Sequence, residues 1–134
     1  MPHLAPHLLL RADAGAVSRA MTLLRAGGYM VSRIEDDELA GAPHVDGVVI
    51  ELPALQTIQF GRKLAARYGD GTVLTLAITS AVQTVQRALP LTLALTPREV
   101  DDDLILTIDL ALAERQRMAL EAAQAPPLLA AASV

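Results

Sequence analysis

The sequence offers serine hydroxyls, but no cysteine thiol, as covalent nucleophiles. A serine becomes nucleophilic when a histidine takes its proton and an acid orients that histidine. Ser18, Ser32 and Ser80 have no such His–Asp arrangement near them in the sequence. The lack of cysteine also excludes disulfides, thiol catalysis and thiolate-bound metal centres. We therefore predict no serine or cysteine nucleophile.

The residues that could bind a metal or a phosphate do not have the spacing that such a site requires. The histidines at positions 3, 7 and 44 fall at a terminus and in a loop, without ligand spacing. Asp101, Asp102 and Asp103 are consecutive, so they fan around a helix instead of converging, and they suit the positive end of its dipole. The segment at 13–15 is too short for a glycine-rich phosphate loop. No metal, cofactor or enzymatic activity is predicted.

The composition argues against nucleic acid and membranes as direct partners. The chain has 134 residues, 11 basic and 15 acidic, for a formal charge of −4, the wrong sign for wrapping a phosphate backbone. Its aromatic residues are only Tyr29, Phe60 and Tyr68, too few for a base-stacking platform. No apolar run approaches the ~20 residues of a membrane span, and the amino end lacks signal-peptide features. We expect a cytoplasmic protein that binds neither nucleic acid nor membrane directly.

Apolar runs alternate with helical patterns along the chain. Strands are expected near residues 8–10, 29–34, 45–52, 72–78 and 91–95. Helices are expected at 14–26, at 54–68, after Ser80 (capped with Gln83 as partner), and from 97 to about 123. The segment at 35–44 is polar and broken by Gly41 and Pro43, so the second helix should be short or missing. Thr96, Pro97 and Glu99 form a capping-box pattern with proline at the first helical position.

Five strands joined by such crossovers predict an α/β fold with a doubly wound parallel sheet. One domain should span residues 1–124. Residues 125–134 contain Pro126-Pro127 near their start and are expected to be a disordered apolar tail.

The order and spacing of these elements resembles the receiver domain of bacterial response regulators over residues 7–118. The resemblance is carried by a helix ending in Gly27-Gly28-Tyr29, the strand VVIELP at 48–53 and the strand–Thr–Pro–helix junction at 93–98. The last helix is similar to that of receivers that continue into a longer signalling helix. This resemblance implies a flavodoxin-like sheet with strand order 2-1-3-4-5.

In receivers, two acids hold Mg²⁺, an aspartate accepts the phosphoryl group, and a Thr or Ser and a Lys contact that group. The resemblance places the acid pair on Arg11 and Ala12, with Asp13 in a third, less critical acidic position. The acceptor falls on Glu51. The Thr/Ser falls on Ala77, or on Thr79 after a shift of two, and the Lys falls on Thr96. All five chemical positions are therefore changed, and we expect a degenerate phospho-acceptor pocket.

A guanidinium at Arg11 repels a divalent cation and offers it no lone pair. If the first and third strands are neighbours, Arg11 and Glu51 both emerge at the carboxyl edge of the sheet. We expect them to form an ion pair that locks the pocket. The simpler alternative for Glu51 is a solvated carboxylate at a strand end, and Thr96 is more simply a helix cap than a phosphate ligand.

The last helix has apolar residues on two sides. One stripe should face the sheet and comprises Leu104, Ile105, Ile108, Ala111 and Leu112. Leu106, Leu110 and Ala113 lie on the other side, and with Arg117 they form a candidate interface. Because exposed apolar patches tend to mark contact sites, we expect a homodimer through this helix. A monomer with an unusually apolar surface is the alternative.

These observations favour a non-catalytic pseudo-receiver that acts by phosphorylation-independent protein–protein interaction in a two-component-type regulatory system. The resemblance suggests a sensor kinase, a phosphotransfer protein or another regulator as partner. Two alternatives remain. The chain is the input domain of a longer transcriptional or antitermination regulator, or it is an active receiver that accepts a phosphoryl group on Glu51.

Overall fold

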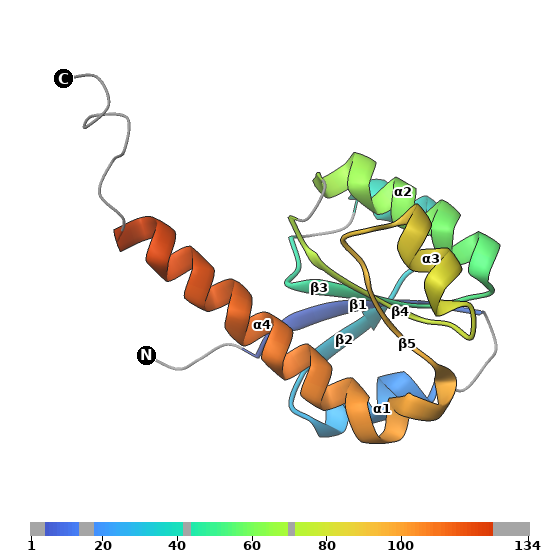
Figure 1. Cartoon of the computed structure of the whole chain (residues 1–134), viewed down its shortest axis with the longest axis horizontal. Coiled ribbons are helices and arrows are strands. Elements are labelled where there is room, and N and C mark those ends of the chain that lie inside the picture. Colours follow the sequence, from blue (N-terminus) through green and yellow to red (C-terminus); the bar gives the residue numbers. More distant parts are fainter. Residues whose placement is uncertain (1–4, 14–17, 42–43, 70–71, 125–134) are drawn as a thin grey trace.

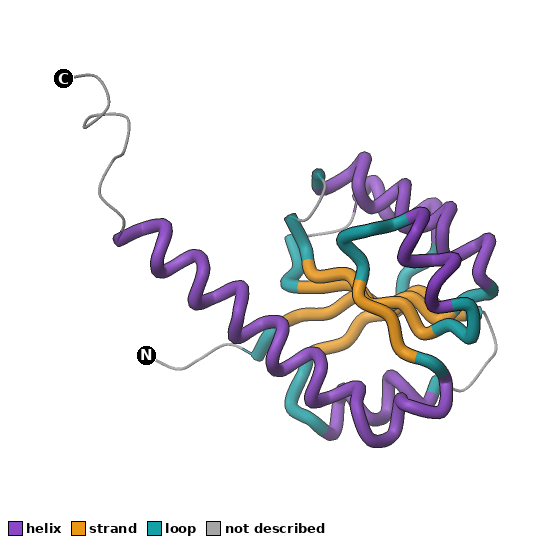
Figure 2. Tube along the Cα trace, in the orientation of Figure 1, coloured by secondary structure: helices purple, strands orange, loops and turns teal. Residues whose placement is uncertain are grey.

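The computed structural model describes residues 5–13, 18–41, 44–69 and 72–124. Five strands form one parallel sheet in the order β2-β1-β3-β4-β5, with helices between successive strands (Figures 1 and 2). The strands are β1 (His7–Ala12), β2 (Met30–Arg33), β3 (Gly47–Glu51), β4 (Leu74–Ile78) and β5 (Leu93–Leu95). The predicted flavodoxin-like α/β fold and its strand order are confirmed.

The helices are α1 (Arg19–Ala26), α2 (Ala54–Tyr68), α3 (Val82–Ala88) and α4 (Val100–Gln124), with short 3-10 helices η1 (Asp36–Gly41) and η2 (Pro97–Glu99). The described part of the connection between β2 and β3 contains only the 3-10 helix η1, so the expectation that the second helix is short or missing is confirmed. The expected start of the first helix at 14–17 and the tail at 125–134 lie outside the described residues.

Helices cover both faces of the sheet. On one face, Leu8 and Leu10 of β1 pack with Leu24 of α1 and with Leu104 and Ile108 of α4. On the other face, a second cluster joins alternate strand residues to η1 and α2, comprising Leu9, Ile34, Leu39, Val48, Ile50, Phe60 and Leu64. Figure 1 shows α1 and α4 below the sheet and α2 and α3 above it. Side chains therefore alternate between two separate apolar layers along β1 and β3, the strands that contribute to both.

The junction after β5 folds as the sequence predicts. The Thr96 backbone N–H donates to the Glu99 Oε1 at 2.9 Å, and the two residues form a capping box with Pro97 at the start of η2. The same contact holds the pKa of the Glu99 carboxyl below its usual range, because the bond favours the charged form. The expected cap at Ser80 is wrong: α3 begins after Ala81, whose N–H donates to the Thr79 hydroxyl at 3.0 Å.

Polar contacts with α1 and with the turn before β2 hold the first half of α4 against the rest of the chain. The Tyr29 hydroxyl, in the turn between α1 and β2, donates to the Asp109 carboxylate of α4. Burial and this bond raise the pKa of Tyr29. Near its start, Asp101 of α4 pairs with Arg19 of α1 at 2.8 Å. These contacts lie along the half of α4 that carries Leu104 and Ile108, so this half is docked on the sheet.

The second half of α4 extends beyond the body of the protein (Figure 1). Residues 116–124 are all exposed. With a rise of about 1.5 Å per residue, this exposed part is about 13 Å long. No described helix is both long and apolar enough to cross a bilayer.

Candidate functional site

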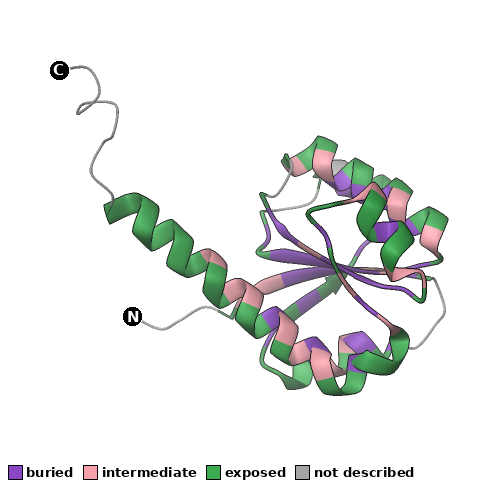
Figure 3. Ribbon diagram, viewed as in Figure 1, coloured by how far each residue is buried: buried purple, intermediate pink, exposed green. Residues whose placement is uncertain are grey.

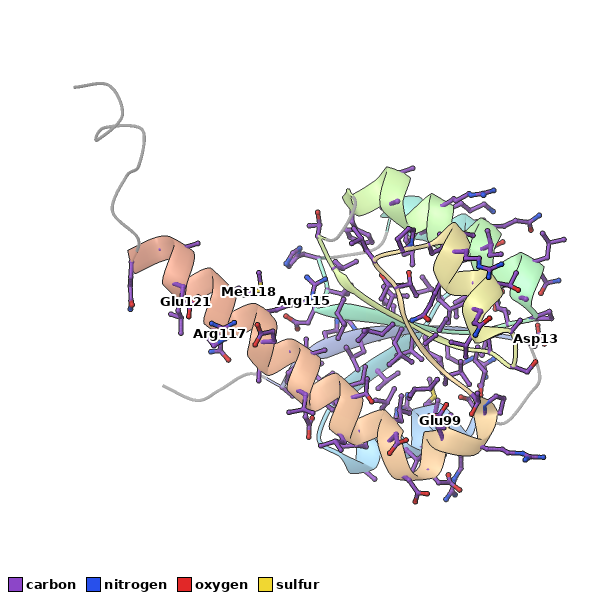
Figure 4. The ribbon with its side chains drawn as sticks, viewed as in Figure 1. Asp13, Glu99, Arg115, Arg117, Met118 and Glu121 are labelled. Atoms are coloured by element: carbon purple, nitrogen blue, oxygen red, sulfur yellow. The ribbon has the colours of Figure 1, made fainter. Side chains whose placement is uncertain are left out.

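The carboxyl edge of the sheet carries a hollow of about 310 Å³. It is lined by Asp13, Glu51, Leu52, Pro53, Ala54, Ile78, Thr79, Ser80 and Pro97. The lining comes from the ends of β1, β3 and β4 and from the junction after β5. This is the edge at which the resemblance placed the degenerate phospho-acceptor pocket. Asp13 marks it in Figure 4, at the opposite end of the molecule from Arg117 and Glu121.

The predicted ion pair between Arg11 and Glu51 is wrong. In the parallel pairing of β1 with β3, Arg11 lies opposite Ile50, and Ala12 lies opposite Glu51. Ile50 belongs to the layer under α2, whereas Ala12 belongs to the layer under α1 and α4. Because paired residues of a sheet share a face and neighbours along a strand do not, Arg11 and Glu51 project from opposite faces. Arg11 and Glu51 therefore lie at the same edge of the sheet without facing each other.

Glu51 instead meets the start of α1. The Ser18 hydroxyl donates to Glu51 Oε1 at 3.1 Å, and Ser18 Oγ accepts the Met21 backbone N–H at 3.2 Å as the N-cap of α1. Ser18 is buried and Glu51 is half-buried. A carboxylate next to a helix N-terminus is favoured by the positive end of the helix dipole. Glu51 is thus a hydrogen-bonded carboxylate, held by the element that follows β1.

Arg11 faces η1 and α2 on the other side of the sheet. Its Nε donates to Asp36 Oδ1 at 2.7 Å, and its Nη1 lies 3.7 Å from Glu35 Oε2. Lys63 of α2 reaches the second Asp36 oxygen at 3.2 Å, and the Arg11 guanidinium lies 6.0 Å from the centre of the Phe60 ring. The Arg11 bond, with smaller help from Lys63, holds the pKa of the Asp36 carboxyl below its usual range. Arg11 therefore anchors the connection between β2 and β3.

The remaining predicted positions are occupied by small or structural residues. Ala12 and Ala77 are fully buried in the sheet, and Ala77 lies between Ile50 of β3 and Ala94 of β5. Ile78 at the end of β4 and the following Thr79 both line the hollow, and Thr79 is the position given by the alternative alignment. Thr96 belongs to the capping box of η2. Asp13 is exposed, and its backbone carbonyl accepts a bond from Arg33 at 2.7 Å.

Sequence reasoning missed Ser18, Asp36 and Lys63. Ser18 precedes an apolar helical pattern, and this is the usual signal for an N-cap. Asp36 and Lys63 gave no local signal, because their contact with Arg11 depends on which face of β1 that residue occupies. Among the described residues, no group of three or more His, Cys, Asp or Glu side chains is placed to hold one metal ion.

The candidate interface on α4 is exposed as predicted. Leu106 is 56% exposed and Leu110 is 62% exposed, and Ala113 is exposed beside them. Arg117 forms ion pairs within α4 with Glu114 and Glu121. The other predicted stripe, including Leu104 and Ile108, is buried against the sheet. Figure 3 shows the exposed surface continuing along α4 to its end.

No protein-family model matches the chain, and no curated protein matches it either.

Replacing Ser18 by alanine should destabilise the protein by about 1 kcal/mol, because α1 loses its N-cap and Glu51 loses its donor. Chemical denaturation at neutral pH measures this change. Ser80→Ala is the matched control, since Ser80 is an exposed serine that lines the hollow beside Glu51 and caps no helix. Equal stability of the Ser18→Ala variant and the parent would contradict the role given to Ser18.

The Asp36 network should give a pH-dependent stability. A carboxyl whose pKa is lowered by folding stabilises the protein above its unfolded pKa of about 3.9, and this contribution is lost as the pH falls through the folded pKa. Asp36→Asn should therefore destabilise the protein at neutral pH, by at most about 1 kcal/mol because Asp36 is partly exposed. The difference from the parent should shrink as the pH falls below about 4.

Urea denaturation midpoints measured from neutral pH to pH 3 test this prediction. Asp37→Asn removes the same charge from the exposed neighbouring position, outside the Arg11 network. A pH-independent difference between the parent and Asp36→Asn would rule out the ionised Asp36 as its cause.

Proposed function

We propose that this chain is a receiver-like signalling module that works by protein contact and does not accept a phosphoryl group. The observation that carries the proposal is the state of Glu51. Its carboxylate is bound by Ser18 at the start of α1, in the position where the receiver resemblance places the phospho-acceptor. An acceptor needs neighbouring groups that bind Mg²⁺ and neutralise the transferred charge, whereas the group bound to Glu51 Oε1 is a neutral serine hydroxyl.

The neighbouring positions support the same proposal. Ala12 and Ala77 provide no ligand for a metal or a phosphoryl group, and Arg11 is engaged with Asp36 on the other face of the sheet. Thr96 stands where a lysine would neutralise charge, and its backbone is used in the capping box. The described lining of the hollow therefore has the carboxylates of Asp13 and Glu51 but no lysine or arginine to neutralise a transferred phosphoryl group.

The proposed contact surface is the outer side of α4, and its proposed occupant is a second copy of this chain. Leu106, Leu110, Ala113, Arg117 and Leu120 follow one another at alternating steps of four and three residues. This spacing is that of a helix–helix seam between two long helices. Leu120 is 54% exposed, so the seam continues from the docked half of α4 onto the part beyond the body.

The ion pairs of Arg117 fit this surface. Glu114 and Glu121 lie on either side of Arg117 and balance its charge within the same helix. A polar residue within an apolar seam is the kind of feature that selects register and partner at some cost in stability. A sensor kinase or phosphotransfer protein is the other partner class that the receiver resemblance suggests. The extension of α4 also supports the alternative of an input domain joined to a longer regulator, which the length of the native gene product would decide.

Incubation with acetyl phosphate and Mg²⁺ should leave the intact mass of the protein unchanged, because Glu51 is bound by Ser18 and lacks a charge-neutralising neighbour. Mass spectrometry measures the adduct, with an active receiver in the same mixture as a positive control. A stoichiometric adduct that disappears in Glu51→Gln would establish the active-receiver alternative.

Charge introduced on the seam should separate the two copies. We expect the parent chain to sediment as a dimer and Leu106→Glu/Leu110→Glu to sediment as a monomer in analytical ultracentrifugation. The matched control is Leu55→Glu/Leu91→Glu, because both of these leucines are 67% exposed and lie away from α4. A monomeric parent, or equal masses for the parent and the seam variant, would refute self-association through α4.

A further inference from the structure

A second cavity lies at the opposite edge of the sheet from the hollow with Glu51. It has a volume of about 330 Å³ and lies between the second half of α2 and the connection from α3 to β5. Leu64 and Ala65 line it from α2, and Val73 and Thr75 line it from the amino end of β4. The other lining residues are Gly61, Arg62, Gly69, Ala88, Leu89, Pro90, Leu91 and Thr92. Figure 1 shows α2 and α3 side by side on this face.

Small residues line the cavity from α2 and α3. A Cβ atom at Gly61 would lie 2.4 Å from Leu89 Cδ1, so glycine allows Leu89 to rest directly against α2. Ala65 and Ala88 line the cavity with single methyl groups. A volume of this size is at the lower end of the range for ligand pockets, which are mostly apolar with a few placed polar groups. The cavity therefore suits a small ligand with an aliphatic body.

The charge around the cavity points to an anion. Arg62 is the only charged residue in the described lining, and it makes no hydrogen bond or ion pair within the described part of the chain. The helices α2 and α3 carry Lys63, Arg67 and Arg87 besides Arg62, and no acidic residue. The helices α2 and α3 are thus basic in a chain with a net charge of −4, although Lys63 is paired with Asp36 of η1 on the same face.

We propose that this cavity binds a small amphipathic carboxylate. Its aliphatic part lies among Leu64, Val73 and Leu89, and its carboxylate accepts hydrogen bonds from the Arg62 guanidinium. An arginine matches the two oxygens of a carboxylate better than a lysine does, because its donors form a planar fork. The carbonyl ends of α2 and α3 lie near the same cavity and favour a cation, so the sign of the ligand charge is the decisive measurement.

Amide NMR titration of the full chain with hexanoate tests the proposal, with hexylamine as the ligand of opposite charge. We expect saturable shifts at the lining residues for hexanoate, with a dissociation constant of about 1 mM for so small a ligand. Hexylamine should give no saturable shifts there. Arg62→Gln should weaken hexanoate binding about tenfold, because it removes a charge-assisted bond. Arg87→Gln removes the same charge outside the cavity and should leave binding unchanged.

Filling the cavity gives an independent measurement. Ala65→Leu should abolish hexanoate binding, whereas Ala66→Leu, one residue further along α2 and exposed, should not. If Ala65→Leu fails to fold, the comparison of Arg62→Gln with Arg87→Gln still decides. The proposal is overturned if hexanoate does not saturate well above millimolar concentration, if hexylamine binds as tightly, or if Arg62→Gln binds hexanoate as the parent does. None of these outcomes depends on self-association or on phosphoryl transfer.

Discussion

The structure depends on the alternation of side chains between two apolar layers of a parallel sheet. The adjacent strands β1 and β3 contribute to the layer under α1 and α4 with one set of residues and to the layer under α2 with the other. At the end of β1 this alternation separates Arg11 from Ala12, and at the end of β3 it separates Ile50 from Glu51. The face on which each charge emerges therefore determines its partner. A shift of one residue in β1 would exchange Arg11 and Ala12 between the two layers.

The two charged groups consequently have separate structural roles. Glu51 joins the end of β3 to the beginning of α1 through Ser18. Arg11 joins the end of β1 to η1 and, through Asp36, to Lys63 of α2. Both contacts connect the carboxyl edge of the sheet to a neighbouring helix, α1 on one face and η1 on the other. The edge is thus held by polar bonds within the chain at the positions where the receiver resemblance implies a metal and a phosphoryl group.

Much of the fold could be predicted because the signals are local. The continuous apolar run of β3, the capping box at Thr96 and Glu99, and the two apolar stripes of α4 each depend on a few neighbouring residues. The contacts of Arg11 could not be predicted in the same way. They require the face of β1, the place of η1 beside it and the reach of Lys63 from α2, and these are properties of the assembled sheet. The bond from the Ala81 N–H to the Thr79 hydroxyl was missed because Ser80, the next residue, carries the same hydroxyl group.

The length of α4 has a consequence for how its outer part can fold. An isolated helix of nine residues is marginal in water, because the first turn fixes several residues for a single hydrogen bond. The docked half of α4 has already met this nucleation cost through the burial of Leu104 and Ile108. Residues 116–124 only need to propagate an existing helix, one hydrogen bond per residue. Packing of the first half of α4 on the sheet thereby stabilises the helical conformation of residues 116–124, which are exposed. Loosening of the docked half should shorten the helix from its free end.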